Sequence, residues 1–556
     1  MSVTSAGCAK GQWCRPSAAL RLCVCLLLVV AACASPAWAD VPGPEPGRRT
    51  VRVRAEKPVG TCYKFWTVGN FNKTHLFVDP NFPKYSRWTS PFVTQANAVY
   101  LLGGRYKDQN RWFLGVGADG KVRADFTGMI AHLRSVRGFG FVPWIVLDNV
   151  PYEMSDPPRE SFYGNTAPPG DERVWHEYVR QAVEAMVKAF GRKTVAKWWF
   201  RVGTEPDLRP GHWAGTKEEF LKHYDYTVDA VTRVLPEAKI GPGNILNPAR
   251  SGRATSARTR WGLDIIDHAA AGKNYCTGKT GTRLDWFSCS WYARVGGSIS
   301  SFDSAMEAMR KRLDRYPQFA NVPIAVGEFA VLGDERGRRL YAGDTTEWSA
   351  SFYAALADRV YAHNVMQVYE WDHATFGVMH PKGHVIGMLE RLAGGKRLAV
   401  EVDGNSAARC GALAATKDGR LLVLLYNHRP GRQPSVAETV RLELRDPRMK
   451  AGQPWRLSEW AVDANRTVWT HAYLADCAAA GVKPLPRAGL HEGSPLRYHG
   501  PQGERIFLKN VAKYRKLAEL PQTKRDEPLA VADGQATIRM TLPGHSVRFL
   551  ELSPPP

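Results

Sequence analysis

Two short apolar segments of the sequence each end by presenting a glutamate. Residues 198–202 precede Glu205, and residues 324–326 precede Glu328. A glutamate placed just after a strand-like run lies at the mouth of that strand, and Pro206 prevents the first strand from continuing. Cleavage of a glycosidic bond requires two carboxyl groups that face one bond. The pattern therefore predicts Glu205 and Glu328 as a catalytic pair.

The two glutamates are expected to have different roles. A retaining glycosidase uses one protonated carboxyl group as the acid and one ionised carboxylate as the nucleophile, about 5 to 5.5 Å apart. We assign Glu205 as the general acid/base and Glu328 as the nucleophile. A separation of about 6.5 Å or more would favour an inverting hydrolase instead, and a lyase on the same fold is a further alternative.

Other side chains are expected at the ends of neighbouring strands. The indole face of Trp371 could stack on a sugar ring, and the hydroxyl of Tyr292 could donate a hydrogen bond to Glu328. The full set of predicted substrate-binding residues is Thr204, Tyr292, Trp371, Asn244, Asp148 and Trp291. No histidines or cysteines have the short paired spacing of a zinc site, so neither a metal nor a cofactor is expected.

The elements that must position these residues alternate between strand-like and helical patterns from residue 60 to residue 395. Eight strands are predicted, at 61–67, 98–102, 141–147, 198–202, 239–241, 286–291, 324–326 and 367–369. An amphipathic helix is predicted before Gly191, and a second one from Thr216, where Glu219 completes a capping box. Such alternation is typical of a (β/α)8 TIM barrel, whose active site lies at the carboxyl ends of the strands.

The pattern changes near residue 396. Segments 420–427, 440–444, 536–542 and 546–552 alternate with a period of two, which predicts an antiparallel β-sandwich as a C-terminal accessory domain over 396–556. Residues 40–59 are expected to form a linker and an N-terminal strand, and the strand at 50–54 could pair with the C-terminal domain rather than with the barrel.

The first 39 residues have the features of a secretory signal peptide. Arg15 and Arg21 precede the apolar run 22–32, and Ala37-Trp-Ala39 has the small residues of a cleavage site. Cys33 also lies in a stretch that resembles the lipobox of bacterial lipoproteins. We expect an exported protein, periplasmic or extracellular, that is either released or held at a membrane by an N-terminal lipid.

The sequence is strongly basic, with a formal net charge of +22, which falls to +19 when the three basic residues of the leader are removed. A positive field attracts polyanions, so an acidic polysaccharide is a candidate substrate. The chain has no zinc finger or basic heptad helix, and nucleic acid is therefore not expected as a partner.

Five cysteines follow the leader. In an oxidising compartment Cys276 with Cys289, and Cys410 with Cys477, are candidate disulfides, whereas Cys62 is expected to be a buried thiol.

An ordered set of motifs in this sequence resembles glycoside hydrolase family 39, the family of β-xylosidases and α-L-iduronidases. The set consists of Glu205-Pro206, Trp213, residues 215–226 and 234–241, Gly327-Glu328-Phe329, and the C-terminal stretches 460–466 and 542–552. The resemblance implies a retaining glycosidase barrel with its glutamates after strands four and seven. This sequence departs from the pattern at Thr204, where related barrels usually carry an asparagine that bonds the sugar's 2-hydroxyl. The alternative is a catalytically silent carbohydrate-binding or matrix protein on the same barrel.

Overall fold

The computed structural model describes residues 47–71, 93–104, 109–249, 261–335, 343–370, 374–375, 377–403, 410–432, 436–485 and 499–555. The segment Glu45–Pro556 forms one compact unit. The predicted signal peptide with Cys33 lies outside the described residues, so its cleavage and lipidation stay predictions. None of the helices in the described ranges combines the length and apolarity that a bilayer crossing requires.

Eight parallel strands form a barrel, as the sequence predicts. In the order in which they pair, they are β10 (Lys239–Pro242), β9 (Trp199–Val202), β6 (Val142–Leu147), β3 (Gln95–Ala98), β2 (Trp66–Phe71), β13 (Val368–Glu370), β12 (Ile324–Gly333) and β11 (Phe287–Arg294). The two end strands meet through a parallel bridge between Ile245 and Cys289, with Ile245 N donating to Ser288 O at 3.0 Å. This bridge closes the sheet, and the carboxyl ends of the strands therefore surround one mouth.

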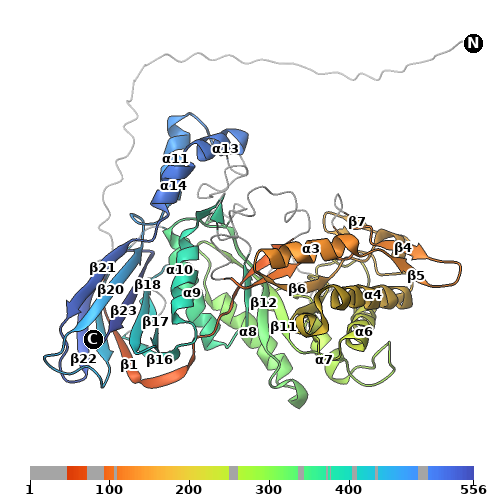
Figure 1. Cartoon of the computed structure of the whole chain (residues 1–556), viewed down its shortest axis with the longest axis horizontal. Coiled ribbons are helices and arrows are strands. Elements are labelled where there is room, and N and C mark those ends of the chain that lie inside the picture. Colours follow the sequence, from red (N-terminus) through yellow and green to blue (C-terminus); the bar gives the residue numbers. More distant parts are fainter. Residues whose placement is uncertain are drawn as a thin grey trace, which may run out of the picture. The chain divides into compact units, whose positions relative to one another are not determined.

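Helices lie around the barrel strands (Figure 1). They are α3 (Thr127–Gly138), α4 (Glu172–Phe190), α5 (Arg192–Val195), α6 (Lys217–Val234), α7 (Asp264–Ala271), α8 (Ser300–Leu313), α9 (Glu347–Ala362) and α10 (Pro381–Leu392). The predicted capping box is present at α6, where Thr216 Oγ1 accepts from Glu219 N at 3.1 Å and Glu219 Oε2 accepts from Thr216 N at 2.6 Å. Helix α4 ends at Gly191, whose φ of 81° suits glycine.

A nine-stranded sheet contains the N-terminal strand and the C-terminal strands. Its order is β21 (Gln522–Leu529), β20 (Trp455–Val462), β23 (Ser546–Ser553), β18 (Arg420–Asn427), β17 (Cys410–Lys417), β16 (Lys396–Val402), β1 (Gly47–Thr61), β19 (Glu438–Arg445) and β22 (Gln535–Leu542). Strand β1 pairs antiparallel with β16 and parallel with β19, which confirms that residues 50–54 join this sheet. Because β1 extends to Thr61, the first barrel strand begins only at Trp66, later than predicted.

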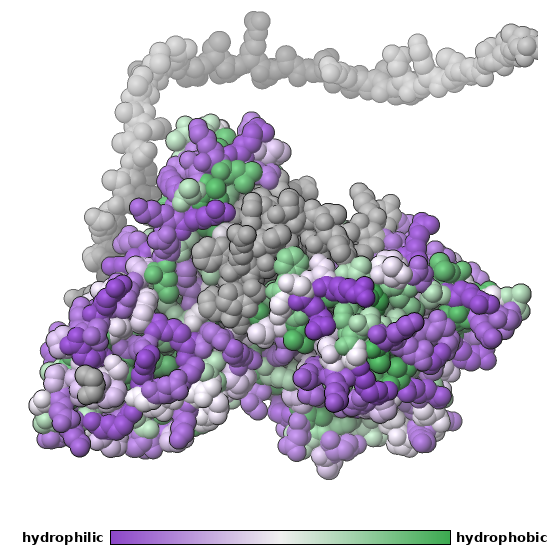
Figure 2. Space-filling view, in the orientation of Figure 1, coloured by the Kyte–Doolittle hydropathy of each residue, from purple (hydrophilic) through white to green (hydrophobic). Residues whose placement is uncertain are grey.

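The period-two pattern of the C-terminal strands places alternate side chains in a common apolar core. Val53, Val423, Leu442, Trp455 and Leu550 are all fully buried in it. The opposite face of β19 carries charged residues, and hydrophilic residues cover much of the visible surface (Figure 2). At the right-hand end of the same view apolar and hydrophilic residues are mixed over β4 (Phe113–Val116) and β5 (Val122–Ala124).

Three helices between β20 and β21 were not predicted from the sequence. They are α11 (Trp469–Ala479), α13 (Gly500–Lys509) and α14 (Val511–Leu517). Trp469, Tyr473, Phe507 and Tyr514 form a separate aromatic cluster that also buries Val378. Trp469 Nε1 donates to Met379 O at 2.9 Å, so these helices contact the segment that follows the last barrel strand.

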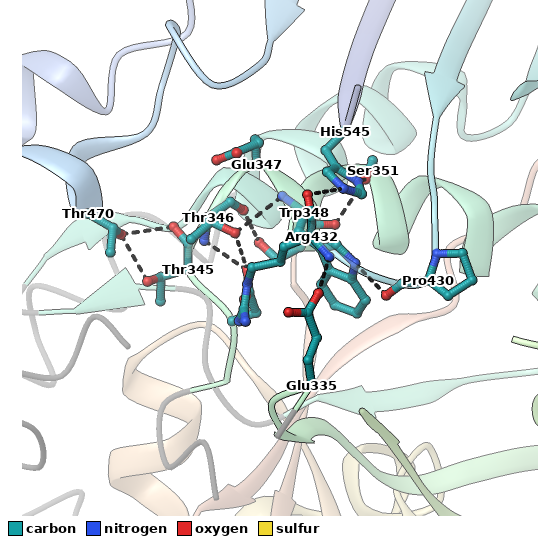
Figure 3. A network of polar contacts seen from close by, with 12 residues as sticks. Glu335, Thr345, Thr346, Glu347, Trp348, Ser351, Pro430, Arg432, Thr470 and His545 are labelled. Carbon is teal, nitrogen blue, oxygen red and sulfur yellow. Dashed lines mark hydrogen bonds and ion pairs between the residues drawn. The ribbon is translucent and has the colours of Figure 1, made fainter. Parts of the chain in front are cut away.

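A buried polar network joins the segment after β12 to the nine-stranded sheet (Figure 3). Asp344 is paired with Arg432 and accepts a hydrogen bond from Thr346 Oγ1 at 2.6 Å. Trp348 Nε1 donates to Pro430 O at 3.0 Å. Both contacts fix the start of α9, which packs against β18 and β23 of the nine-stranded sheet and, through Phe352, against Phe329 of β12.

The predicted disulfides are wrong for this structure, in which all five described cysteines are free thiols. Cys289 lies inside the barrel wall at the bridge that closes it, whereas Cys276 lies on the loop after α7. Cys410 is in the core of the nine-stranded sheet, and Cys477 belongs to the separate helical cluster. The prediction for Cys62 is confirmed, because its side chain is fully buried.

Candidate active site

Glu205 and Glu328 come to the mouth of the barrel from two different strands. Glu205 follows β9 in the left-handed region, with φ of 42°, and its backbone N–H donates to Asn244 O at 2.9 Å. Glu328 lies within β12, which continues beyond the predicted end, and pairs in register with Ser290 of β11. Each glutamate is only 6% exposed.

The carboxylate of Glu328 is held by a tyrosine and an arginine. Tyr292, at the end of β11, donates its hydroxyl to Glu328 Oε2 at 2.5 Å. Arg201 Nη2 lies 3.7 Å from Glu328 Oε1, and its guanidinium is almost wholly buried. Asn97 Nδ2 also donates to Gly327 O, at 3.2 Å, so the backbone before the carboxylate is fixed. A donated hydrogen bond and a nearby cation both stabilise a negative charge on Glu328.

The surroundings of Glu205 have the opposite effect. Burial, and next the negative charge of Glu328, raise the pKa of Glu205 to about 8, against a hydrogen bond from Ser290. His212 Nε2 lies 3.5 Å from Glu205 Oε2. Around neutral pH these surroundings therefore favour the protonated form of Glu205.

Thr204 and Asp148 form a linked pair next to Arg201. Thr204 Oγ1 donates to Asp148 Oδ2 at 2.7 Å and accepts from Arg201 Nη2 at 3.0 Å. Asp148 Oδ1 accepts from the backbone N–H of Tyr100 at 3.0 Å. Burial raises the pKa of Asp148 to about 6, although the hydrogen bond from Thr204 opposes the shift. Both residues thus contact the site through Arg201 and its bond network.

The structure corrects two of the predicted substrate-binding residues. Asn244 is fully buried and donates to Ser290 Oγ at 2.5 Å, so it orients the hydroxyl that bonds Glu205 and does not reach the mouth. Trp291 points out of the barrel, because successive side chains of a strand alternate and Tyr292 points inward. Its ring stacks on Phe329 at a centroid distance of 5.6 Å and meets Phe302 of α8 edge-on.

Trp371 lies outside the described residues, and its role stays a prediction. The preceding residue, Glu370, ends β13 and is buried in an ion pair with Lys382 of α10.

Four residues of the site were missed by the sequence analysis: Arg201, Ser290, His212 and Tyr163. The alternation of β11 could have identified Ser290, which is two residues before Tyr292 and faces the same side of the strand. No local pattern marks His212, which contacts Glu205 from the loop after β9, or Tyr163, whose ring stacks on His212 at 4.0 Å.

One cluster in the described part of the chain could hold a metal ion. Atoms of His176, Asp229 and Cys276 lie within 4.8 Å of one another between α4, α6 and the loop after α7. Asp229 Oδ2 is already 2.7 Å from His176 Nε2 and 2.5 Å from Arg233 Nε. The arginine supplies the positive charge that a metal would bring, so we assign this cluster a structural role.

Sequence relatives match parts of the chain. An alpha-1,4-L-rhamnosidase of Formosa agariphila is 24% identical over 264 residues, which are 45% of this chain and 51% of the relative. A beta-xylosidase of Caldicellulosiruptor saccharolyticus is 27% identical over 195 residues, 35% of this chain and 36% of the relative. An alpha-L-iduronidase of Mus musculus is 27% identical over 192 residues, 34% and 28% of the two chains. The chain thus spans about half the length of these relatives or less.

Solved structures match nearly all of the chain at low sequence identity. The GH39 enzyme from Xanthomonas axonopodis pv. citri has a TM-score of 0.67 and 16% identity, covering 92% of this chain and 99% of that one. A bacterial orthologue of human α-L-iduronidase has a TM-score of 0.68 and 15% identity, covering 91% and 84%. These likenesses show a shared fold. The sequence profile of glycosyl hydrolases family 39 matches residues 50–382, more than half of the sequence, and this chain therefore belongs to that family.

Proposed function

We propose that this chain is a retaining glycoside hydrolase that cleaves a glycosidic bond in an extracellular poly- or oligosaccharide. The observation that carries the proposal is the contrast between the two carboxyl groups of the site. Burial and the charge of Glu328 favour a protonated Glu205, whereas Tyr292 and Arg201 stabilise an ionised Glu328. Two carboxyl groups whose surroundings favour opposite protonation states are suited to act as an acid and a nucleophile.

In the first half of the reaction, Glu328 attacks the anomeric carbon while Glu205 donates its proton to the leaving oxygen. The bond to the leaving group breaks, and a covalent glycosyl ester forms on Glu328. The ester of Glu328 carries no charge and therefore does not repel a negative charge on Glu205. The ionised form of Glu205 is then less unfavourable than it was beside an ionised Glu328. The loss of one charge thus assists the appearance of the other.

In the second half, a water molecule attacks the same carbon and Glu205 accepts its proton. The ester bond breaks, Glu328 is released as a carboxylate, and the sugar leaves with the configuration it had in the substrate. The hydroxyl of Tyr292 and the guanidinium of Arg201 then stabilise the restored charge of Glu328.

We propose a class of substrate and not a particular sugar. The names of the three relatives refer to rhamnose, xylose and iduronate. They therefore support a glycoside as the substrate but do not indicate which sugar it contains. The net charge of +22 supports an acidic polysaccharide, because a basic surface raises its local concentration. We further propose an exported protein, with the barrel over 60–395 and an accessory β-sandwich over 396–556, to whose sheet β1 also contributes.

The experiment that tests this function is the release of new reducing ends from a panel of neutral and acidic polysaccharides. Wild type should release them, and Glu328→Gln should reduce the rate by at least about a thousandfold with little change in melting temperature. Glu218→Gln, the same substitution at a side chain of α6 that is 64% exposed, is the matched control and should stay near wild-type activity.

The second candidate is a silent carbohydrate-binding protein, which is favoured only by Thr204 in place of the usual asparagine. Equal binding of glycans by wild type and Glu328→Gln, with release by neither, would identify this alternative. Product analysis by NMR would separate retention from inversion: a product with the substrate's anomeric configuration supports the double displacement.

A further inference from the structure

We propose that an aromatic ledge beside Glu205, formed by Phe162, Tyr163 and His212, binds a sugar ring on the leaving-group side of the scissile bond. The inference rests on the proposed function and adds a second binding position to it. The ligand would be an oligosaccharide with at least one further sugar beyond the bond that is cleaved. None of the three residues stands out in the sequence, since they lie on two separate loops.

The ledge is connected to the proposed acid by a chain of short contacts. His212 Nε2 is 3.5 Å from Glu205 Oε2. The ring of Tyr163 stacks on that of His212, with centroids 4.0 Å apart and planes at 23°. Phe162 meets Tyr163 edge-on at 5.1 Å. The aromatic surface therefore begins at the carboxyl group of Glu205 and extends outward from it.

The outer end of the ledge is open to solvent. The side chain of Phe162 is 67% exposed, which is the largest exposure of any large apolar residue in the described ranges. Tyr163, by contrast, is partly buried against Val99, Tyr100 and Val146 of the barrel mouth. Phe162 is therefore an exposed ring that borders the partly buried ring of Tyr163.

The hairpin that carries the ledge is held in place on both sides. Its two strands, β7 (Glu160–Ser161) and β8 (Gly164–Asn165), pair directly around Phe162 and Tyr163. Ser161 Oγ accepts from Tyr163 N at 3.0 Å and donates to Gly211 O at 3.3 Å, next to His212. A Cβ on Gly164, whose φ is 94°, would come within 2.2 Å of Gly104 O. The hairpin is thus packed closely against the barrel mouth.

The chemistry of the reaction decides which side of the bond the ledge serves. The general acid must lie beside the oxygen of the leaving group, whereas the nucleophile approaches the sugar from the opposite face. Among the described contacts, the ledge reaches the catalytic pair at Glu205, through His212. The ledge therefore borders the space into which the leaving group extends.

A sugar ring is the occupant that fits this surface. One face of a pyranose carries C–H groups, which pack well against an aromatic ring, and its hydroxyls stay in water at the rim. An exposed phenylalanine offers no hydrogen bond, so it would bind a ring by stacking and tolerate different hydroxyl patterns. We therefore expect the ledge to raise affinity for longer saccharides.

The test compares two leaving groups on the same sugar. For an oligosaccharide substrate, Phe162→Ala should lower kcat/KM about tenfold, while the glycosyl fluoride of the same sugar, whose leaving group is a single atom, should change by less than about twofold. Phe162→Trp should keep near wild-type activity on both. Tyr275→Ala removes another exposed aromatic ring, on the loop after α7, and should change neither. Equal effects of Phe162→Ala on both substrates would overturn the proposal.

Binding is measured apart from turnover on an array of neutral and uronate-containing oligosaccharides, with Glu328→Gln as the parent protein. The parent should bind glycans that the double variant with Phe162→Ala binds at least about fivefold more weakly. Unchanged binding, or no glycan bound by the parent, would overturn the ledge while leaving the turnover assay to judge the glycosidase. If binding depends on Phe162 but the wild type releases no reducing ends from the glycans that are bound, the ledge is retained and the proposed hydrolysis is refuted.

Discussion

The hydroxyl of Thr204 is fully engaged within the protein. It gives its single proton to Asp148 and accepts from Arg201, so it has no proton left for a sugar. The asparagine usual at this position has two N–H donors. The sugar's 2-hydroxyl must therefore either donate to this network or find its partner elsewhere.

At the residue scale, the two glutamates are expected to titrate as a coupled pair. Replacing Glu328 with glutamine removes the repulsion that is the second cause, after burial, of the raised pKa of Glu205. The pKa of Glu205 should therefore fall in Glu328→Gln, as measured by NMR titration of 13C-labelled glutamate carboxyls and assigned by comparison with Glu205→Gln. An unchanged or higher pKa would contradict the proposed proximity of the two groups.

The pH dependence of turnover follows from the same environment. Glu205 must be protonated to act as the acid, so kcat/KM on a natural glycoside should decline as the pH rises through about 8, the raised pKa of Glu205. A substrate with an activated aryl leaving group needs less protonation and should lose less activity over that range. Identical profiles for the two substrates would argue against Glu205 as the acid.

At the scale of elements, the segment between β12 and α9 is held by the buried pair of Asp344 and Arg432 (Figure 3). Burial acts to raise the pKa of Asp344, but the charge of Arg432 and the hydrogen bonds of Thr346 outweigh it and hold the pKa below its usual value. This segment follows the strand that carries Glu328. The pair therefore ties the chain after that strand to the loop that follows β18.

Breaking this pair should be costly. Asp344→Asn leaves Arg432 buried without its counter-charge and should lower the free energy of unfolding by about 3 to 5 kcal/mol at neutral pH. Because the pKa is lowered in the folded state, the stabilisation is present above the usual pKa of an aspartate and is lost as the pH falls through the lowered value. Urea unfolding at neutral and acidic pH would measure the difference.

The control for this prediction is Asp526→Asn, which breaks the exposed pair with Arg456 and should change stability little. A similar loss in the two variants, or a loss for Asp344→Asn that does not shrink at low pH, would refute the role given to the buried pair.

At the scale of the whole molecule, the barrel and the nine-stranded sheet share one apolar core. Leu424 and Tyr426 of β18 and Phe549 of β23 belong to the same buried cluster as the barrel residues. Tyr426 also donates to Asp358 of α9 at 3.2 Å. A fragment ending at residue 395 would expose this surface of α9 and lose the partners of β1 as well.

The chain from residue 47 onward should therefore unfold in a single cooperative transition when heated in a calorimeter. The fragment 60–395 should be insoluble or lack a cooperative transition, because it would expose apolar residues of the shared core and a domain is stabilised by only about 5 to 15 kcal/mol. Two resolved transitions, or a folded fragment, would contradict this expectation and show that the two predicted domains unfold independently.

Local patterns in the sequence were sufficient for most of the barrel strands, the capping box at Thr216, and the place of Glu205 just after β9, whereas β12 continues past Glu328 to Gly333. These features depend on the period of apolar residues and on contacts within one turn, which neighbouring residues determine. The pairing of residues 50–54 with the C-terminal strands was one of two alternatives, because an alternating pattern identifies a strand but does not indicate which strand pairs with it.

Only the tertiary structure decided which side chains meet. The inward face of β11 made Tyr292 a partner of Glu328 and left Trp291 in the core, and closure of the barrel brought Asn244 under Ser290. The fold also places Cys410 and Cys477 in two different apolar clusters, although the sequence suggested them as a pair. The contact of Tyr163 with His212 joins the loops that follow β6 and β9, and it forms only because these two strands pair side by side.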